Sequence, residues 1–295
     1  MAYRLGIQET VESGIRRVGC EQVEDATAWI DGAEADVETA VHEVRKTCKK
    51  IRGLVRLVRP GLGSVYRAEN AWFRDTARQL SGMRDLHVMG RTFDGVCERF
   101  TDTYDSNRFA PLRERLFERQ ADGGPETGQA LTMLAELRPA LVEARARIAQ
   151  WRIEGSGFAA LEPGLCLTYR RGRRAMAAVA EHASEEAVHE WRKRAKYHWY
   201  HLRLLANCWR PVMDAWRAEA DALSEELGDA HDLCVLRRAL ATDVELLQAS
   251  AELPTFLTLI DRRADELVAT ALARGQRLYA EPPRRLGERL GQYWQ

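Results

Sequence analysis

The sequence predicts an all-α protein made of two sequence-related helical bundles. Long stretches are rich in Ala, Leu, Glu and Arg, with apolar residues three and four positions apart, a spacing typical of amphipathic helices. Glycine, proline and β-branched runs are sparse, and no strand pattern stands out. An internal repeat predicts that there are two related bundles. Residues 41–57 read VHEVRKTCKKIRGLVRL, and residues 188–204, 147 positions later, read VHEWRKRAKYHWYHLRL.

The repeat extends beyond this helix. The segment LSGMRDLHVM at 80–89 aligns with LGDAHDLCVL at 227–236, again 147 positions apart. The return to one offset predicts two copies of a unit of about four to five helices, in a pseudo-twofold arrangement. Asp85 and Asp232 lie where a helix is expected to begin, so we interpret them as helix caps or as partners of a neighbouring arginine.

Prolines and glycines divide each unit. Pro60 and Pro211 follow the repeated helices and are expected to end them. A closing helix is predicted from residue 131 and from residue 257, and Pro139 is expected to kink the first of these.

The two closing helices are only 126 positions apart, so the first copy carries 21 extra residues, around 101–128. A linker-like Glu-Gly-Ser-Gly at 154–157 places the boundary between the bundles, which we predict to span 1–155 and 156–295.

Composition narrows the class of protein. With 295 residues and 45% hydrophobic residues the chain can bury a sizeable core. No window approaches the roughly 18 apolar residues of a membrane span, and the N-terminus has no apolar signal core, so a soluble cytoplasmic protein is expected. The six cysteines include no CxxC pair, which predicts reduced core residues and neither a zinc site nor disulfides. No cofactor is indicated.

The formal net charge is zero, yet the positive charge is concentrated in the repeated helices. Residues 41–59 hold seven Lys and Arg against one acid, and residues 188–210 hold six against one. Such segregation produces a local field that attracts anions.

On a helix, the basic groups of the first copy fall on one stripe about 120° wide, and the apolar residues fall on the opposite face. Gly53 lies within the stripe and is expected to let an anion approach closely. Like charges four residues apart cost a helix roughly 0.2–0.5 kcal/mol per pair, so the stripe indicates a multivalent anionic partner. A merely solvent-exposed basic face is the alternative. The stripe residues are His42, Arg45, Lys46, Lys49, Arg52 and Arg56, and Lys50 lies beside the stripe as a further candidate for anion binding.

The second copy repeats the stripe with more aromatic character. Tyr197, Trp199 and Tyr200 replace Lys50, Arg52 and Gly53, so we expect weaker anion binding there. Glu43 and Glu190 flank the stripes and are expected to bridge to neighbouring helices. The histidines of the stripes are expected to add charge below about pH 6.5. The basic residues here are His189, Arg192, Lys193, Lys196 and Arg203.

Two further histidines, His198 and His201, are spaced three residues apart on the predicted core side. This spacing suits a metal pair, but no carboxylate accompanies it, so a packing or polar-network role is favoured.

The doubled HExRKxxK, with the LxxxRDLxV-like segment at 80–88 and its partner at 227–235, resembles the CHAD family of conserved-histidine α-helical domains. The resemblance covers nearly the whole chain and implies two helical bundles around a basic groove that binds inorganic polyphosphate, often at polyphosphate granules. It implies that the six basic residues of the first stripe and the five of the second line the groove. His231 departs from the pattern, standing where the first copy has Arg84. The ExExK signature of the fused triphosphatase-like domain is absent, so a stand-alone CHAD protein is expected.

The predicted function is therefore non-catalytic binding of inorganic polyphosphate. The first alternative is a nucleic-acid-binding helical protein, although no helix-turn-helix, zinc-finger or RNP-like motif accompanies the stripes. The second is a metal-dependent polyphosphate phosphohydrolase, which requires metal-holding carboxylates beside the phosphate site, and the stripes supply none.

Overall fold

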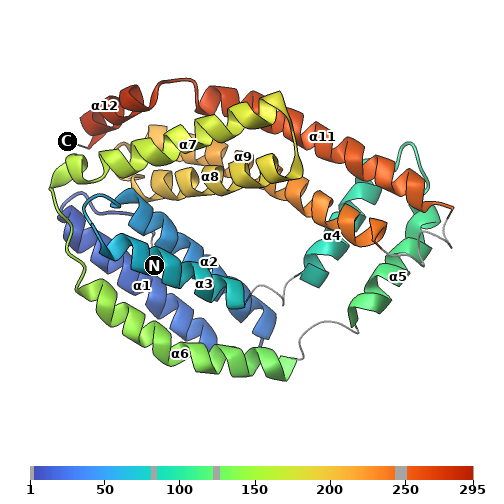
Figure 1. Ribbon diagram of the computed structural model, residues 1–295, viewed down its shortest axis with the longest axis horizontal. Helices are drawn as coiled ribbons and strands as arrows, with labels where there is room; N and C mark the ends of the chain where they lie inside the picture. Colours follow the sequence, from blue (N-terminus) through green and yellow to red (C-terminus); the bar gives the residue numbers. More distant parts are fainter. Residues whose placement is uncertain (1–2, 81–84, 122–126, 243–250, 295) are drawn as a thin grey trace.

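The computed structural model describes residues 3–80, 85–121, 127–242 and 251–294, which form α-helices and two short 3-10 helices and no strand (Figure 1). The all-helical prediction is confirmed. The elements are α1 (Val11–Asp31), α2 (Val37–Leu57), α3 (Val65–Gln79), α4 (Asp85–Arg99), η2 (Ser106–Phe109), α5 (Ala110–Ala121), α6 (Thr127–Ala149), η3 (Gly157–Ala160), α7 (Glu162–Glu181), α8 (Glu185–Leu204), α9 (Arg210–Ala241), α11 (Leu253–Leu278) and α12 (Pro283–Tyr293).

The repeated helices α2 and α8 begin with side-chain caps and end at equivalent positions. Asp36 and Ser184 each accept a hydrogen bond from a backbone N–H three residues on, at Thr39 and Ala187. Both helices end 147 residues apart, at Leu57 and Leu204, before the prolines are reached. Pro60 lies in the turn after α2, but Pro211 lies in the first turn of α9. The prediction that Pro211 ends a helix is therefore wrong, because the first turn needs no N–H from proline.

The segment at 227–236 lies inside one helix of 32 residues, α9. Asp232 is in its interior, so its interpretation as a cap is wrong. The first copy divides the equivalent length between α3 and α4, and the intervening residues 81–84 lie outside the described part of the chain. Asp85 is the first described residue of α4, and its side chain lies outside the described residues, so its interpretation as a cap stays a prediction.

The extra residues of the first copy form η2 and α5, which packs against α4. The two closing helices, α6 and α11, each begin four residues before the predicted start, at Thr127 and Leu253. Helix α6 continues through Pro139 to Ala149.

Helices from both halves share one hydrophobic core. Helix α1 packs on α2 and α6, and α8 packs on α7 and α9. Helix α4 contacts η2 and α5 of its own half and also packs against α9 and α11 of the other half (Figure 1). There the Phe93 ring stacks on Phe256 with centroids 4.2 Å apart, and Phe109 lies 4.9 Å from Phe256.

The chain passes from α6 to α7 through glycines that adopt left-handed backbone conformations. Gly155 has a φ of 87° and Gly157 a φ of 55°, and other residues reach this region only with strain. These conformations agree with the linker-like sequence Glu-Gly-Ser-Gly at 154–157. The boundary between two bundles near residue 155 stays a prediction.

All six cysteines are free thiols, as expected. Cys48 and Cys166 are buried and the other four are half-buried. Burial raises the pKa of the Cys48 thiol to about 12, so it remains protonated and unreactive. No helix within the described ranges is long and apolar enough to cross a membrane.

Candidate functional site

Helix α2 has one face in the core and one half-exposed basic face. The predicted apolar residues Val44, Cys48, Ile51, Leu54 and Val55 are all fully buried. The basic side chains of the same helix are half-buried. We call this set the first cationic face (His42, Arg45, Lys46, Lys49, Lys50, Arg52 and Arg56) and its counterpart on α8 the second cationic face (His189, Arg192, Lys193, Lys196 and Arg203).

The two cationic faces meet where α2 contacts α8. A Cβ atom added to Gly53 would lie 2.9 Å from Cβ of Tyr200 and 3.1 Å from the hydroxyl of Tyr3. Nε2 of His201 lies 3.1 Å from the Gly53 carbonyl oxygen. Gly53 is thus covered by protein, and the expectation that it lets an anion approach is wrong. The missing side chain instead allows the two helices to come close.

From this contact the two helices diverge. Figure 1 shows α2 and α8 close together near their C-terminal ends and apart at their N-terminal ends. Gly53 and Tyr200 belong to the same helix faces as the basic residues, since they lie three, four or seven positions from several of them. The two cationic faces therefore lie next to each other at this contact. Further toward the N-terminus of α8, His189 and Lys196 lie against α9.

Neutral groups hold the two arginines at the end of the first cationic face. The amide oxygen of Asn70, on α3, accepts hydrogen bonds from Nη1 of Arg56 at 2.5 Å and from Nε of Arg52 at 3.4 Å. The Arg56 guanidinium also lies 3.9 Å from the centroid of the Tyr197 ring. Burial lowers the pKa of Arg56 below its ordinary value. These contacts fix the guanidinium groups without neutralising them.

Each face carries one acid, and it pairs within its own helix. Glu43 accepts from Nζ of Lys46 at 2.9 Å, and Glu190 lies 2.5 Å from Nζ of Lys193 and also pairs with Arg194. The expectation that these acids bridge to neighbouring helices is wrong, because the lysine three residues on is within direct reach.

An acid from another helix lies beside the second cationic face. Nζ of Lys196 lies 3.8 Å from the Trp199 ring centroid and 3.7 Å from Oδ1 of Asp221, on α9. Burial lowers the pKa of Lys196, while Asp221 opposes that shift. Arg203 lies over the rings of Trp199 and Tyr3, with centroid distances of 4.7 and 5.2 Å.

The histidine of the second face is harder to protonate than an ordinary histidine. The His189 ring lies 4.6 Å from the ring of His231, on α9. Burial, followed by the charges of Lys193 and Arg192, lowers the pKa of His189 below 6.5, and burial lowers that of His231 to about 4. His189 in the unliganded protein therefore becomes charged at a lower pH than an ordinary histidine.

The core location expected for His198 and His201 is confirmed, since their exposed fractions are 1% and 0%. The His198 ring packs against Tyr169, Trp216 and Tyr279. Burial lowers the pKa of both histidines to about 3, so both are neutral at pH 7.

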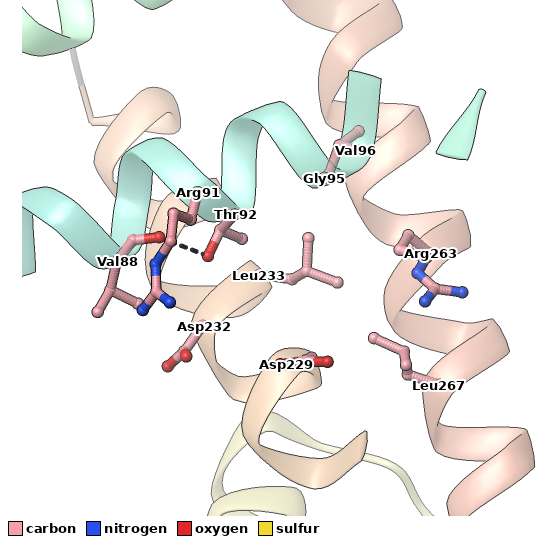
Figure 2. Close-up of a pocket in the computed structure, with 10 residues that line it drawn as sticks. All are labelled: Val88, Arg91, Thr92, Gly95, Val96, Asp229, Asp232, Leu233, Arg263 and Leu267. Atoms are coloured by element: carbon pink, nitrogen blue, oxygen red, sulfur yellow. Dashed lines mark hydrogen bonds between the residues drawn. The ribbon is translucent and has the colours of Figure 1, made fainter. Parts of the chain in front are cut away.

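A separate pocket of about 260 Å³ lies where α4, α9 and α11 meet (Figure 2). Asp229 and Asp232 of α9 line it together with Arg91 of α4 and Arg263 of α11. Burial and the neighbouring Asp232 raise the pKa of Asp229. Acids and arginines mix here, so the pocket does not favour a polyanion as the cationic faces do.

Three residues that shape the site could not be predicted. Asn70, Asp221 and Tyr3 reach the cationic faces from α3, α9 and the N-terminal segment. Their positions in the sequence do not indicate that they contact the repeated helices, because contacts between helices depend on how the helices pack.

Comparisons with known proteins agree with the repeat pattern. A family model described as CHAD domain matches residues 18–241. Two proteins of Mycobacterium tuberculosis, uncharacterized protein MT2285 of strain CDC 1551 / Oshkosh and uncharacterized protein Rv2226 of strain ATCC 25618 / H37Rv, are each 29% identical over 250 residues. The aligned part covers 77% of this chain but only 44% of either relative, so the match spans less than half of their length.

Proposed function

Because the chain belongs to the CHAD domain family, which is associated with polyphosphate-related functions, we propose that it binds inorganic polyphosphate without hydrolysing it. One observation carries the proposal: the two cationic faces meet where α2 contacts α8, at Gly53 and Tyr200. A linear polyanion that crosses this contact would meet lysines and arginines of both helices.

The side chains suit phosphate chemistry. Arginine donates paired hydrogen bonds to phosphate oxygens, and lysine supplies a mobile point charge. Arg52 and Arg56 are held by Asn70, so little side-chain entropy remains to be lost when they bind an anion.

We infer further that an approximate twofold axis relates the repeats near the contact between α2 and α8. Gly53 and Tyr200, which touch there, occupy equivalent positions. Arg56 lies on Tyr197. At the equivalent positions, Arg203 lies near Lys50, since burial and then the charge of Arg203 lower the pKa of Lys50. A crystal structure in which α1 and α2 superpose on α7 and α8 by a rotation far from twofold would contradict this.

The acids beside the cationic faces favour binding over hydrolysis. Glu43, Glu190 and Asp221 each pair with a lysine of the site. Phosphoryl transfer uses carboxylates that hold metal ions beside the phosphate. Release of orthophosphate from polyphosphate in the presence of Mg²⁺ or Mn²⁺ would show that an enzyme is the better description.

A nucleic acid is the second candidate, since a phosphate backbone also binds basic helix faces. Arg52 and Arg56 lie half-buried beside the close helix contact at Gly53, which suits a thin, flexible chain better than a duplex. Competition separates the two ligands. If duplex DNA or RNA displaces long-chain polyphosphate at equal phosphate concentration, the nucleic-acid function is correct.

The proposal is tested by titrating polyphosphate of uniform length into the wild type and the triple variant Arg45→Ala/Lys46→Ala/Lys49→Ala. The loss of three phosphate contacts should weaken binding and make the slope of log K against log salt concentration shallower by about 2. Helix content, measured by circular dichroism, should change little because the substituted face lies outside the core.

A control with equal loss of charge is Arg152→Ala/Arg284→Ala/Arg285→Ala. These side chains are 82%, 88% and 74% exposed and lie outside the cationic faces. The control should keep the wild-type affinity and salt slope. Unchanged affinity in the first triple variant would show that the site is assigned to the wrong face.

A further inference from the structure

A small pocket near the C-terminal end of α2 is lined by four arginines from three parts of the chain. Arg56 comes from α2, Arg59 from the turn after it, Arg171 from α7 and Arg194 from α8, with Tyr66 and Tyr197 beside them. Helix α7 reaches this place because Gly164 lies against the last carbonyl groups of α2, where an added Cβ would be 2.0 Å from the Leu57 oxygen. Arg171 follows Gly164 by seven residues, on the same helix face.

The four guanidinium groups have little compensating negative charge. Arg194 pairs with Glu190, which is shared with Lys193. Arg59 lies over the Tyr66 ring, 4.8 Å from its centroid. Among the described residues, no acid forms an ion pair with Arg59 or Arg171.

The arginines also repel one another. Burial, then the charges of Arg194 and Arg59, lowers the pKa of Arg171. Burial is likewise the main cause of the lowered pKa of Arg56, whose Nε is buried without a hydrogen-bond partner in the part of the chain that the structure describes. An anion in the pocket would relieve this repulsion and supply the missing acceptor.

We propose that the four-arginine pocket binds the terminal phosphate of a linear polyphosphate chain, an inference that rests on the proposed function. The pocket has a volume of about 10 Å³, room for about one water-sized group. One phosphate oxygen fits such a space. A terminal phosphate carries more charge and one more free oxygen than an internal one, so an arginine cluster favours it.

The opposite side of the contact between α2 and α8 lacks such a cluster. Lys50 and Arg203, which correspond to Tyr197 and Arg56 in the repeat, both lie over the Tyr3 ring, 6.0 and 5.2 Å from its centroid. Lys50 and Arg203 therefore share the Tyr3 ring, whereas the pocket on the first side gathers four arginines. We accordingly expect the protein to bind one end of the polyphosphate chain in this way.

The test compares a short linear polyphosphate of uniform length with the same chain capped at both ends by a neutral amine through a P–N bond. The cap removes a charged oxygen from each terminal phosphate and leaves internal phosphates unchanged. The wild type should bind the free-ended chain about tenfold more tightly, the size of one charge-assisted hydrogen bond. Arg171→Gln should abolish this preference while keeping the wild-type affinity for the capped chain.

Arg170→Gln is the matched control, because it removes the same charge from the exposed side of α7 and should keep the preference. Arg59→Gln tests the pocket from the turn after α2 and should act like Arg171→Gln. Equal binding of free and capped chains by the wild type would overturn the terminal-phosphate site and leave the proposed function standing. Equal effects of Arg170→Gln and Arg171→Gln would also overturn it. Failure to bind either chain would instead refute the proposed function itself.

Discussion

His198 is a buried histidine whose two ring nitrogens have no hydrogen-bond partner among the described residues. Its neighbour His201 differs, since Nε2 contacts the Gly53 carbonyl oxygen. Both have a pKa of about 3, far below the ordinary value of 6.5, because burial opposes the charged form. As the pH falls, the unfolded chain takes up these protons before the folded protein does. The stability due to the two histidines is full above about pH 6.5 and is lost as the pH falls toward 3.

Replacing His198 by phenylalanine should make the protein less sensitive to acid. The aromatic neighbours can accept another ring, and one group that titrates only in the unfolded state disappears. The free energy of unfolding can be measured with urea at several pH values below 6.5. As the pH is lowered, it should decrease less steeply in His198→Phe than in the wild type, by about 1.4 kcal/mol per pH unit.

The exposed position His182, just after α7, supplies the control for this experiment. His182→Gln should keep the wild-type slope. A wild-type slope in His198→Phe as well would mean that the His198 ring is not held neutral by burial.

At the residue scale, the sequence predicted which side chains face the core but not their partners. The helical period placed Val44 and Cys48 opposite the basic residues, because burial requires an apolar stripe at that spacing. It could not reveal Asn70 as the acceptor for Arg52 and Arg56, since that contact depends on the packing of α3 against α2.

At the element scale, the contact between α2 and α8 depends on one missing side chain. Gly53→Ala would place its Cβ 2.9 Å from Cβ of Tyr200, where neither helix backbone can move freely. We expect this overpacking to reduce the free energy of unfolding by about 1–3 kcal/mol, measured by urea denaturation.

Gly95→Ala, in α4, is the matched control. A Cβ at Gly95 meets no atom within 4 Å, so the better helix propensity of alanine should stabilise the protein by about 0.8–1 kcal/mol. A stabilising effect of Gly53→Ala would show that α2 and α8 are not in close contact there.

Helix existence was easier to predict than helix ends. The closing helices were expected from their apolar spacing, yet both begin four residues earlier, at Thr127 and Leu253. Gly228 did not break α9, because the surrounding Ala, Leu and Glu residues favour helix strongly enough to continue through it. Asp232 consequently lies in mid-helix instead of at a cap.

At the scale of the whole molecule, the two cationic faces should contribute unequally to polyphosphate binding. The first keeps Arg52 and Arg56 on neutral partners, whereas Lys196 of the second has Asp221 nearby. Arg45→Ala/Lys46→Ala/Lys49→Ala should therefore reduce affinity more than Arg192→Ala/Lys193→Ala/Lys196→Ala. The expected difference is about 1 kcal/mol, roughly fivefold, measured by titration at low salt.

The two triple variants remove the same residue types from equivalent positions, so each is the other's control. Equal losses would show that Asp221 leaves the binding strength of the second face unchanged. A larger loss in the second variant would reverse the predicted order.

The packing of α4 against the other half of the chain has a consequence for synthesis. Phe93 is buried against Phe256, about 160 residues later in the sequence. At roughly 5–20 residues per second, a ribosome needs about 8–30 s to supply that partner. During this interval α4 emerges from the ribosome without its binding surface, so the apolar side chains of the first half depend on chaperones, or on temporary non-native contacts, until α9 and α11 have been made.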